Sequence, residues 1–253
     1  MATLEALHAA VIAAPDDEDA RLAYAHAVAA TDPERAELIR LQIDLTGWRR
    51  ARVAPPEMTA AAQRVQVLLE RNADRWSADV APLVDGVSFF RGFVEHVQLD
   101  ASRFLSTGPR LYQTAPVLHL DLTGVKPVAE ELFRSPLLER IETLELMRNE
   151  LGDAEATLIA ASPHLARLKW LGLALNRIGD AGLDALAASK TLGALRYLCF
   201  ADNATRDPTP ANADDYSYDS EEAVALMAKH GARPWLSSQA RWAWPPPRDA
   251  VVE

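Results

Sequence analysis

Two histidines and two aspartates have the types and the spacing of a metal site. His96 and Asp100 belong to one short segment of alternating apolar and polar residues, and His119 and Asp121 belong to the next. If the two segments are adjacent strands, about 4.8 Å apart, the imidazoles are neighbours with carboxylates on the same face. Imidazole and carboxylate groups bind zinc. One hypothesis is therefore a metal-dependent enzyme or metal-binding protein that uses His96, His119 and Asp121; the alternative is a polar surface on which the two rings stack.

A second group of residues is typical of a surface that binds another protein. Trp170 and Tyr197 occupy the same position in two matching segments, with glycine and alanine beside them. Tryptophan and tyrosine dominate interface hot spots, and small neighbours leave room for an inserted side chain. The predicted contact residues are Trp170, Tyr197, Glu145, Met147, Asp121, His119 and Cys199. The alternative is that the chain itself covers the two aromatic rings, which then belong to the core.

The sequence offers little for nucleophilic or cofactor chemistry. Cys199 is the single cysteine, and its counterparts in the preceding matching segment, Gly172 and Ala174, supply no base to activate a thiol. Motifs of the forms G-x-S-x-G, H-E-x-x-H and G-x-G-x-x-G and a P-loop are absent from the sequence. We therefore expect no enzyme activity, no catalytic residue, no bound metal and no cofactor.

A repeat places these side chains. Residues 141–149, 168–176 and 195–203 share the pattern L-x-x-L-x-L-x-x-N, allowing aliphatic or aromatic residues at the leucine positions, and each starts 27 residues after the one before. Alternating apolar residues indicate a short strand with one face in a core. A Gly-Asp pair follows the first two segments and indicates a helix that the aspartate would cap. Each unit is thus expected to contain a strand, a turn and a helix.

This pattern resembles the leucine-rich repeat, and the 27-residue period with a helix resembles its ribonuclease-inhibitor-like class. Two weaker copies at residues 94–102 and 117–125 precede the three clear ones. The resemblance implies an α/β solenoid of about five repeats, with parallel strands on the concave face and helices on the convex face. A short solenoid needs a cap at each end.

The N-terminal part is predicted to be a helical cap module. Apolar residues recur at helical spacing, and Asp32-Pro33 is typical of a helix start. The motifs Pro15-Asp16-Asp17, Arg21-Leu22-x-Tyr24-Ala25 and Asp32-Pro33-x-Arg35-x-Glu37-x-Ile39-Arg40-Leu41-Gln42 resemble the repeat-companion domain. That domain precedes leucine-rich repeats in myxobacterial and planctomycete proteins, so the resemblance implies a bacterial protein; it implies no activity.

The C-terminal part contains an acidic loop at residues 204–220, a helix at 221–230 and a segment rich in tryptophan and proline. We expect this last segment to cap the open end of the solenoid; the alternative is a proline-rich ligand for another protein. The predicted domains are therefore a helical module at residues 1–78, repeats at 79–205, and the loop, helix and tail at 206–253.

The net charge and the amino-acid composition disfavour several classes of function. A net charge of −10 disfavours sequence-independent binding of nucleic acid or of anionic membranes. No run of 18 apolar residues is present, and a single cysteine cannot form an internal disulfide, so we expect a cytoplasmic protein. The leading hypothesis is a monomeric, non-enzymatic protein-interaction module, an adaptor, inhibitor or regulator, whose partner has a basic surface.

Overall fold

The structure is a computed structural model that describes residues 2–205 and 221–236. The predictions for most of the acidic loop, and for the tail after residue 236, lie outside the described residues. The chain forms two compact units. Of the described residues, unit 1 contains 2–97 and 109–118, and unit 2 contains 98–108, 119–205 and 221–236.

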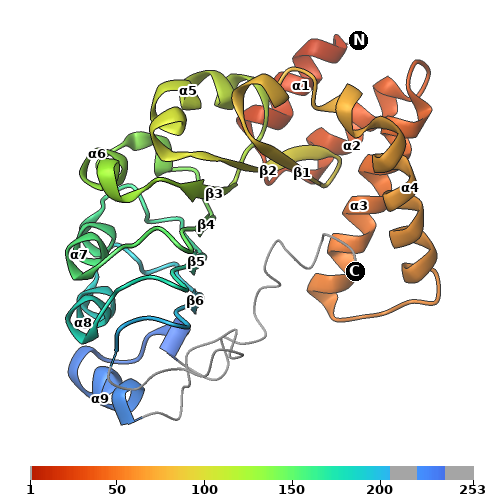
Figure 1. Cartoon of the computed structure of the whole chain (residues 1–253). Helices are drawn as coiled ribbons and strands as arrows, with labels where there is room; N and C mark the ends of the chain where they lie inside the picture. The colour runs from red at the N-terminus through yellow and green to blue at the C-terminus, as the bar shows by residue number, and fades with distance from the viewer. Residues whose placement is uncertain (1, 206–220, 237–253) are drawn as a thin grey trace. The chain divides into compact units, whose positions relative to one another are not determined.

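Unit 1 is built from helices followed by a β-hairpin (Figure 1). Its elements are α1 (Leu4–Ala13), α2 (Glu18–Val28), α3 (Pro33–Ala51), α4 (Met58–Trp76), the 3-10 helix η1 (Ala81–Leu83), β1 (Gly86–Phe90) and the first part of β2 (Phe93–Asp100). Asp17 and Asp32 cap α2 and α3, as acids at a helix start should. The predicted helix start at Asp32-Pro33 is confirmed.

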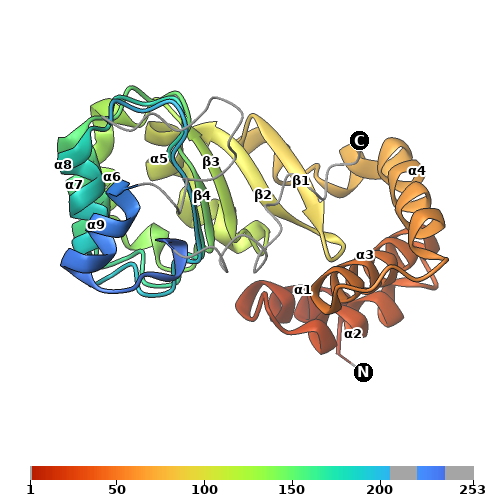
Figure 2. The ribbon, with the colours of Figure 1, turned by 90° about the horizontal axis from the view of Figure 1, so that it is seen from below.

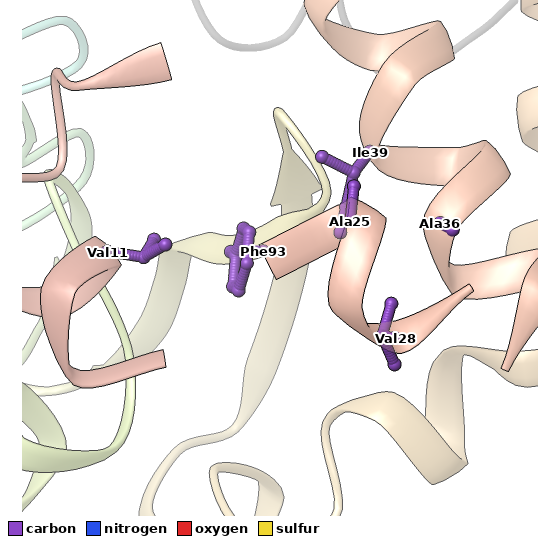
Figure 3. Close-up of a cluster of buried hydrophobic side chains, with 6 residues drawn as sticks. All are labelled: Val11, Ala25, Val28, Ala36, Ile39 and Phe93. Carbon is purple, nitrogen blue, oxygen red and sulfur yellow. The ribbon is translucent and has the colours of Figure 1, made fainter. Parts of the chain in front are cut away.

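The core of unit 1 lies where α1, α2 and α3 meet β2 (Figure 3). Val11, Ala25, Val28, Ala36, Ile39 and Phe93 form this buried cluster. Arg91 and Gly92 join β1 to β2 with φ angles of 46° and 83°, and two positive φ values suit a tight hairpin turn. Gly92 lies so close to Ile39 that a Cβ atom would sit 2.7 Å from the Ile39 Cα atom. The turn therefore requires glycine both for its φ angle and for its contact with α3.

Unit 2 is an α/β arrangement of short strands and helices. Its elements are α5 (Ala101–Thr114, in part), β3 (His119–Thr123), η2 (Lys126–Val128), α6 (Ala129–Phe133), η3 (Pro136–Leu138), β4 (Thr143–Glu145), α7 (Asp153–Ala161), β5 (Trp170–Gly172), α8 (Asp180–Ala188), β6 (Tyr197–Cys199), α9 (Glu221–His230) and η4 (Pro234–Leu236). Strands β3 to β6 are neighbours in the order of the chain and pair in parallel. Helices α6, α7 and α8 lie side by side on one side of these strands (Figures 1 and 2).

Asparagine side chains connect successive strand–helix units. The Asn176 Oδ1 atom accepts hydrogen bonds from the backbone N–H groups of Asn149 (3.0 Å) and Leu151 (3.1 Å). Its Nδ2 group donates to the carbonyls of Leu146 and Leu173. Asn149 and Asn203 make corresponding bonds at their own turns. The asparagine that ends each copy of the sequence pattern thus satisfies backbone groups of the turns.

The aspartates of the Gly-Asp pairs do not cap their own helices, so that prediction is wrong. Gly152 and Gly179 are the N-cap residues, and each aspartate is the first helical residue. The Asp153 Oδ1 atom instead accepts from the backbone N–H groups of Gly179 (2.7 Å) and Gly182 (3.0 Å) in the following unit. Asp153 therefore links two helices rather than ending one.

In the part of the chain that the structure describes, no helix has both the length and the apolar character needed to cross a bilayer.

Candidate functional site

The predicted contact residues lie on the face of β3–β6 opposite the helices, which we call the sheet face. Strand register aligns them in two rows: His119, Thr143, Trp170 and Tyr197 in the first, and Asp121, Glu145, Gly172 and Cys199 in the second. The leucines that alternate with these rows, such as Leu144 and Leu171, are fully buried on the helix side. The repeat period alone thus predicts which side chains are neighbours.

Trp170 and Tyr197 are in contact, as the sequence predicts. Their rings are stacked, with centroids 5.9 Å apart and planes 7° from parallel. Gly172 makes room for this arrangement, since a Cβ atom there would lie 2.6 Å from the Cη2 atom of Trp170 and would also overlap the Glu145 carboxylate. Any side chain at residue 172 would displace the indole or the carboxylate.

Trp170 is nevertheless not exposed, which corrects the expectation of an open aromatic pair. Only 5% of its surface is accessible. Its Nε1 atom and the Thr143 Oγ1 atom beside it on β4 are buried, and neither has a hydrogen-bond partner among the described residues. The Tyr197 ring stacked on it and the close approach of Gly172 help to explain the burial of the indole.

The other predicted contact residues divide by exposure. His119 and Glu145 are buried, and the Glu145 Oε1 atom accepts a hydrogen bond from the backbone N–H of Met147 (3.1 Å). Partly exposed residues are Asp121, Met147, Tyr197 and Cys199. Asp121 accepts a hydrogen bond from the Gln98 side chain (3.1 Å). A binding partner could therefore reach these four side chains directly, whereas Trp170, His119 and Glu145 lie beneath the surface.

The geometry of the described residues does not support the hypothesis of a metal site. Within residues 2–205 and 221–236, no group of three or more His, Cys, Asp or Glu side chains is arranged to hold a metal ion, so His96, His119 and Asp121 do not form one. The Nδ1 atom of His96 lies 3.3 Å from the Ser88 hydroxyl. Asp100 accepts hydrogen bonds from Ser102 and Arg103 at the start of α5, and the Ser102 hydroxyl lowers the pKa of its carboxyl group.

Unit 1 contains a buried ionic cluster that the sequence analysis did not single out. Glu95, which is 1% exposed, pairs with Arg21 (2.8 Å) and with Arg91 (2.7 Å). Arg21 also donates to the carbonyls of Pro15 and Arg91. Burial lowers the pKa of Arg21 to about 10, because it disfavours the charged form, although Glu95 opposes the shift.

Arg35 is buried in a different environment from Arg21 and Arg91. It is 7% exposed, and its guanidinium carbon lies 4.9 Å from the ring centre of Trp76, 5.3 Å from Phe89 and 5.2 Å from Phe93. Burial lowers the pKa of Arg35 to about 10. The guanidinium group makes no hydrogen bond to any described residue. The aromatic rings stabilise its charge, and the Asp32 carboxylate attracts it electrostatically.

One feature of the sequence could have indicated these buried polar residues of unit 1. Arg21, Arg35 and Gln42 all belong to the motifs that carry the resemblance to the repeat-companion domain, and all three are buried. Gln42 holds the hairpin turn, because its Nε2 group donates to the Phe89 carbonyl (2.9 Å) and its Oε1 atom accepts from Gly92 N–H (2.8 Å). Polar residues within a helical motif thus mark the interior of the module as well as its surface.

Comparison with known proteins adds no functional assignment: no protein-family model matches the chain, and no curated protein matches it.

Proposed function

We propose that unit 2 is a leucine-rich repeat solenoid of the ribonuclease-inhibitor-like class and that its sheet face binds another protein. The 27-residue spacing of the asparagine bonds and the parallel register of β3–β6 support the solenoid. The α1–α4 region would then be the repeat-companion module. The protein would act as an adaptor, an inhibitor or a regulator, without enzyme activity.

One observation carries the binding proposal: aligned strands present Asp121, Tyr197 and Cys199 on a single face, Met147 follows β4 in the chain, and all four residues are partly exposed. An aromatic ring, a flexible thioether and a carboxylate on a flat array form a mixed apolar and acidic surface. Tyr197 is the anchor in this proposal, since tyrosine is enriched among hot spots. Trp170 acts from the neighbouring strand, because its stacked indole fixes the plane of the Tyr197 ring.

The net charge of the chain indicates which kind of protein would bind. With a net charge of −10, the protein attracts a partner with a basic surface and repels acidic ones. We place this binding in the cytoplasm on the single cysteine, which gives no support for an oxidising compartment.

Affinity capture from a lysate of the source cells tests the proposal. Wild-type protein, the Tyr197→Ala variant and a Lys190→Ala control serve as baits, because Lys190 is an exposed residue after α8 and away from the sheet face. We expect wild type and the control to retain the same protein and Tyr197→Ala to retain roughly one-tenth as much or less, because a hot-spot truncation costs about 2 kcal/mol. Equal retention by all three baits would contradict binding through the sheet face.

A further inference from the structure

The aromatic cluster of unit 1 surrounds the Arg35 guanidinium, which forms no ion pair with any residue that the structure describes. Phe93 is its centre: the ring lies 5.2 Å from the Tyr24 ring, 5.9 Å from the His8 ring and 5.2 Å from the Arg35 guanidinium carbon. Phe93 itself is buried, whereas Tyr24 and His8 are partly exposed. The rings of Tyr24 and His8 and the Arg35 guanidinium thus all lie against the Phe93 ring, which is labelled in Figure 3.

The carboxylates of Asp32 and Glu95 already have hydrogen-bond or ion-pair partners. The Asp32 carboxylate accepts from the Arg75 guanidinium (2.7 Å), the Trp76 Nε1 group (2.8 Å) and the backbone N–H of Arg35 (3.1 Å). Glu95 is held by Arg21 and Arg91. The interior therefore contains three buried arginines and one buried glutamate, and Arg35 is the arginine without an ion pair to any described residue.

The unused hydrogen-bonding groups point to a ligand. The Nη1 atom of Arg35 is fully buried without a partner among residues 2–205 and 221–236, and the other guanidinium nitrogens, which make no hydrogen bond there either, keep contact with solvent. The Tyr24 hydroxyl and the His8 ring also make no hydrogen bond in the described chain. Arg35 acts electrostatically on both of these groups. A buried charged group without hydrogen-bond partners is costly, so such groups are normally matched by an opposite charge.

We propose that unit 1 binds an oxyanion group, a carboxylate or a phosphate, at Arg35, with Tyr24 and His8 as further hydrogen-bond donors. The planar guanidinium fork suits two oxygens of either group. The Arg35 guanidinium carbon lies over the rings of Trp76 and Phe89, so the ligand meets a donor that the surrounding rings already hold in place. This site is independent of the sheet face, and its failure would leave the proposed function unaffected.

Titration of the full-length protein with inorganic phosphate and with acetate tests the site, with sodium chloride at matched ionic strength as the reference. The readouts are the melting temperature and the NMR signals of the His8 ring. We expect phosphate or acetate to raise the melting temperature and to shift the His8 signals, and chloride to do neither. Whichever of the two oxyanions acts at lower concentration identifies the ligand class.

Variants separate a specific site from a general salt effect. Tyr24→Phe keeps the ring but removes one donor, so binding should weaken roughly 2- to 10-fold. Arg35→Lys keeps the charge but loses the fork, so binding should weaken roughly 10-fold or more. Arg71→Lys is the control, because Arg71 is an exposed residue of α4 paired only loosely with Glu34, at 3.7 Å. Binding in this control should match wild type.

The outcomes are decisive even if Arg35→Lys does not fold, since Tyr24→Phe and the His8 signals then decide. Equal effects of chloride, phosphate and acetate on wild type would overturn the proposal. So would unchanged binding in Tyr24→Phe together with His8 signals that do not respond to either oxyanion.

Discussion

Trp170 shows how one residue can satisfy a sequence pattern and still have a different role from the one the pattern suggests. Its position in the repeat places it on the sheet face, which is normally open to solvent. The glycine two residues later leaves space for the indole, and the tyrosine on the next strand stacks on it, so the indole is buried. The residue types at positions 172 and 197 therefore decide how exposed Trp170 is. The spacing of apolar residues around Trp170 does not predict this exposure.

We predict that Trp170→Ala destabilises the protein by about 3–5 kcal/mol, because it removes a large buried aromatic side chain and leaves a cavity. Tyr197→Ala, which truncates the partly exposed partner of the stack, should cost less than half as much. Chemical denaturation of both variants provides the measurement. If Trp170→Ala has the same midpoint denaturant concentration as wild type, the Trp170 ring is not part of the interior. Trp170 would then again be a candidate contact residue.

At the scale of elements, the sequence predicts the repeated part of the fold well. The 27-residue period places β4, β5 and β6 in parallel register, and the Asn176 bonds follow from it. It does not reveal the hydroxyl bonds that repeat with the same period, Ser162 Oγ to the Phe133 carbonyl and Ser189 Oγ to the Ala160 carbonyl, both 2.6 Å. Serines in a polar return segment look like any loop residue until the neighbouring unit is in place.

The sequence predicts the sheet face better than it predicts the environment of Arg35. Neighbours on the sheet face follow from the period, so the Trp170–Tyr197 contact was foreseen. The Arg35 environment joins α3 to the end of α4 and to the hairpin, and no spacing in the sequence encodes that meeting. Long-range packing between dissimilar elements is thus what the sequence analysis could not supply.

We predict that Asn176→Ala destabilises unit 2 by about 1–3 kcal/mol, because buried backbone groups of two turns lose their hydrogen-bond partner. Asn203→Ala should cost less, since Asn203 is partly exposed and its Oδ1 atom accepts from the backbone N–H of Ile178 alone among the described residues. Thermal unfolding of the two variants compares them. Equal losses would indicate that a further repeat unit continues beyond Asn203.

The packing of α9 on α8 should depend on pH through Asp184. Its Oδ1 atom contacts Lys229 Nζ at 2.7 Å and His230 Nε2 at 2.8 Å. The hydrogen bond from Lys229, followed by that from His230, lowers the pKa of Asp184 below the ordinary value of 3.8. A depressed acid pKa gives stability that is present above the unfolded value and lost as the pH falls through the folded value.

We therefore predict that hydrogen exchange of α9 amides, corrected for the intrinsic pH dependence of exchange, speeds up as the pH falls below 3.8. In Asp184→Asn, α9 should already exchange faster near neutral pH, with no further step on acidification. The matched control is Glu130→Gln, which removes an exposed acid of α6 that pairs with Arg134, the C-cap residue of the same helix. A step at acidic pH that persists in Asp184→Asn would assign the effect to another group.

At the scale of the whole molecule, charge should control how fast the partner binds. A net charge of −10 attracts a basic protein from a distance, whereas the contacts of Tyr197 act only after the surfaces meet. We predict that the association rate falls as salt rises, because ions screen the attraction over roughly 8 Å at physiological ionic strength. Tyr197→Ala should instead raise the dissociation rate and keep the same salt dependence. Surface-based kinetics with the captured partner measure both rates across a salt series. An association rate that does not change with salt would exclude a partner with a basic surface, even if Tyr197 proves to be the anchor.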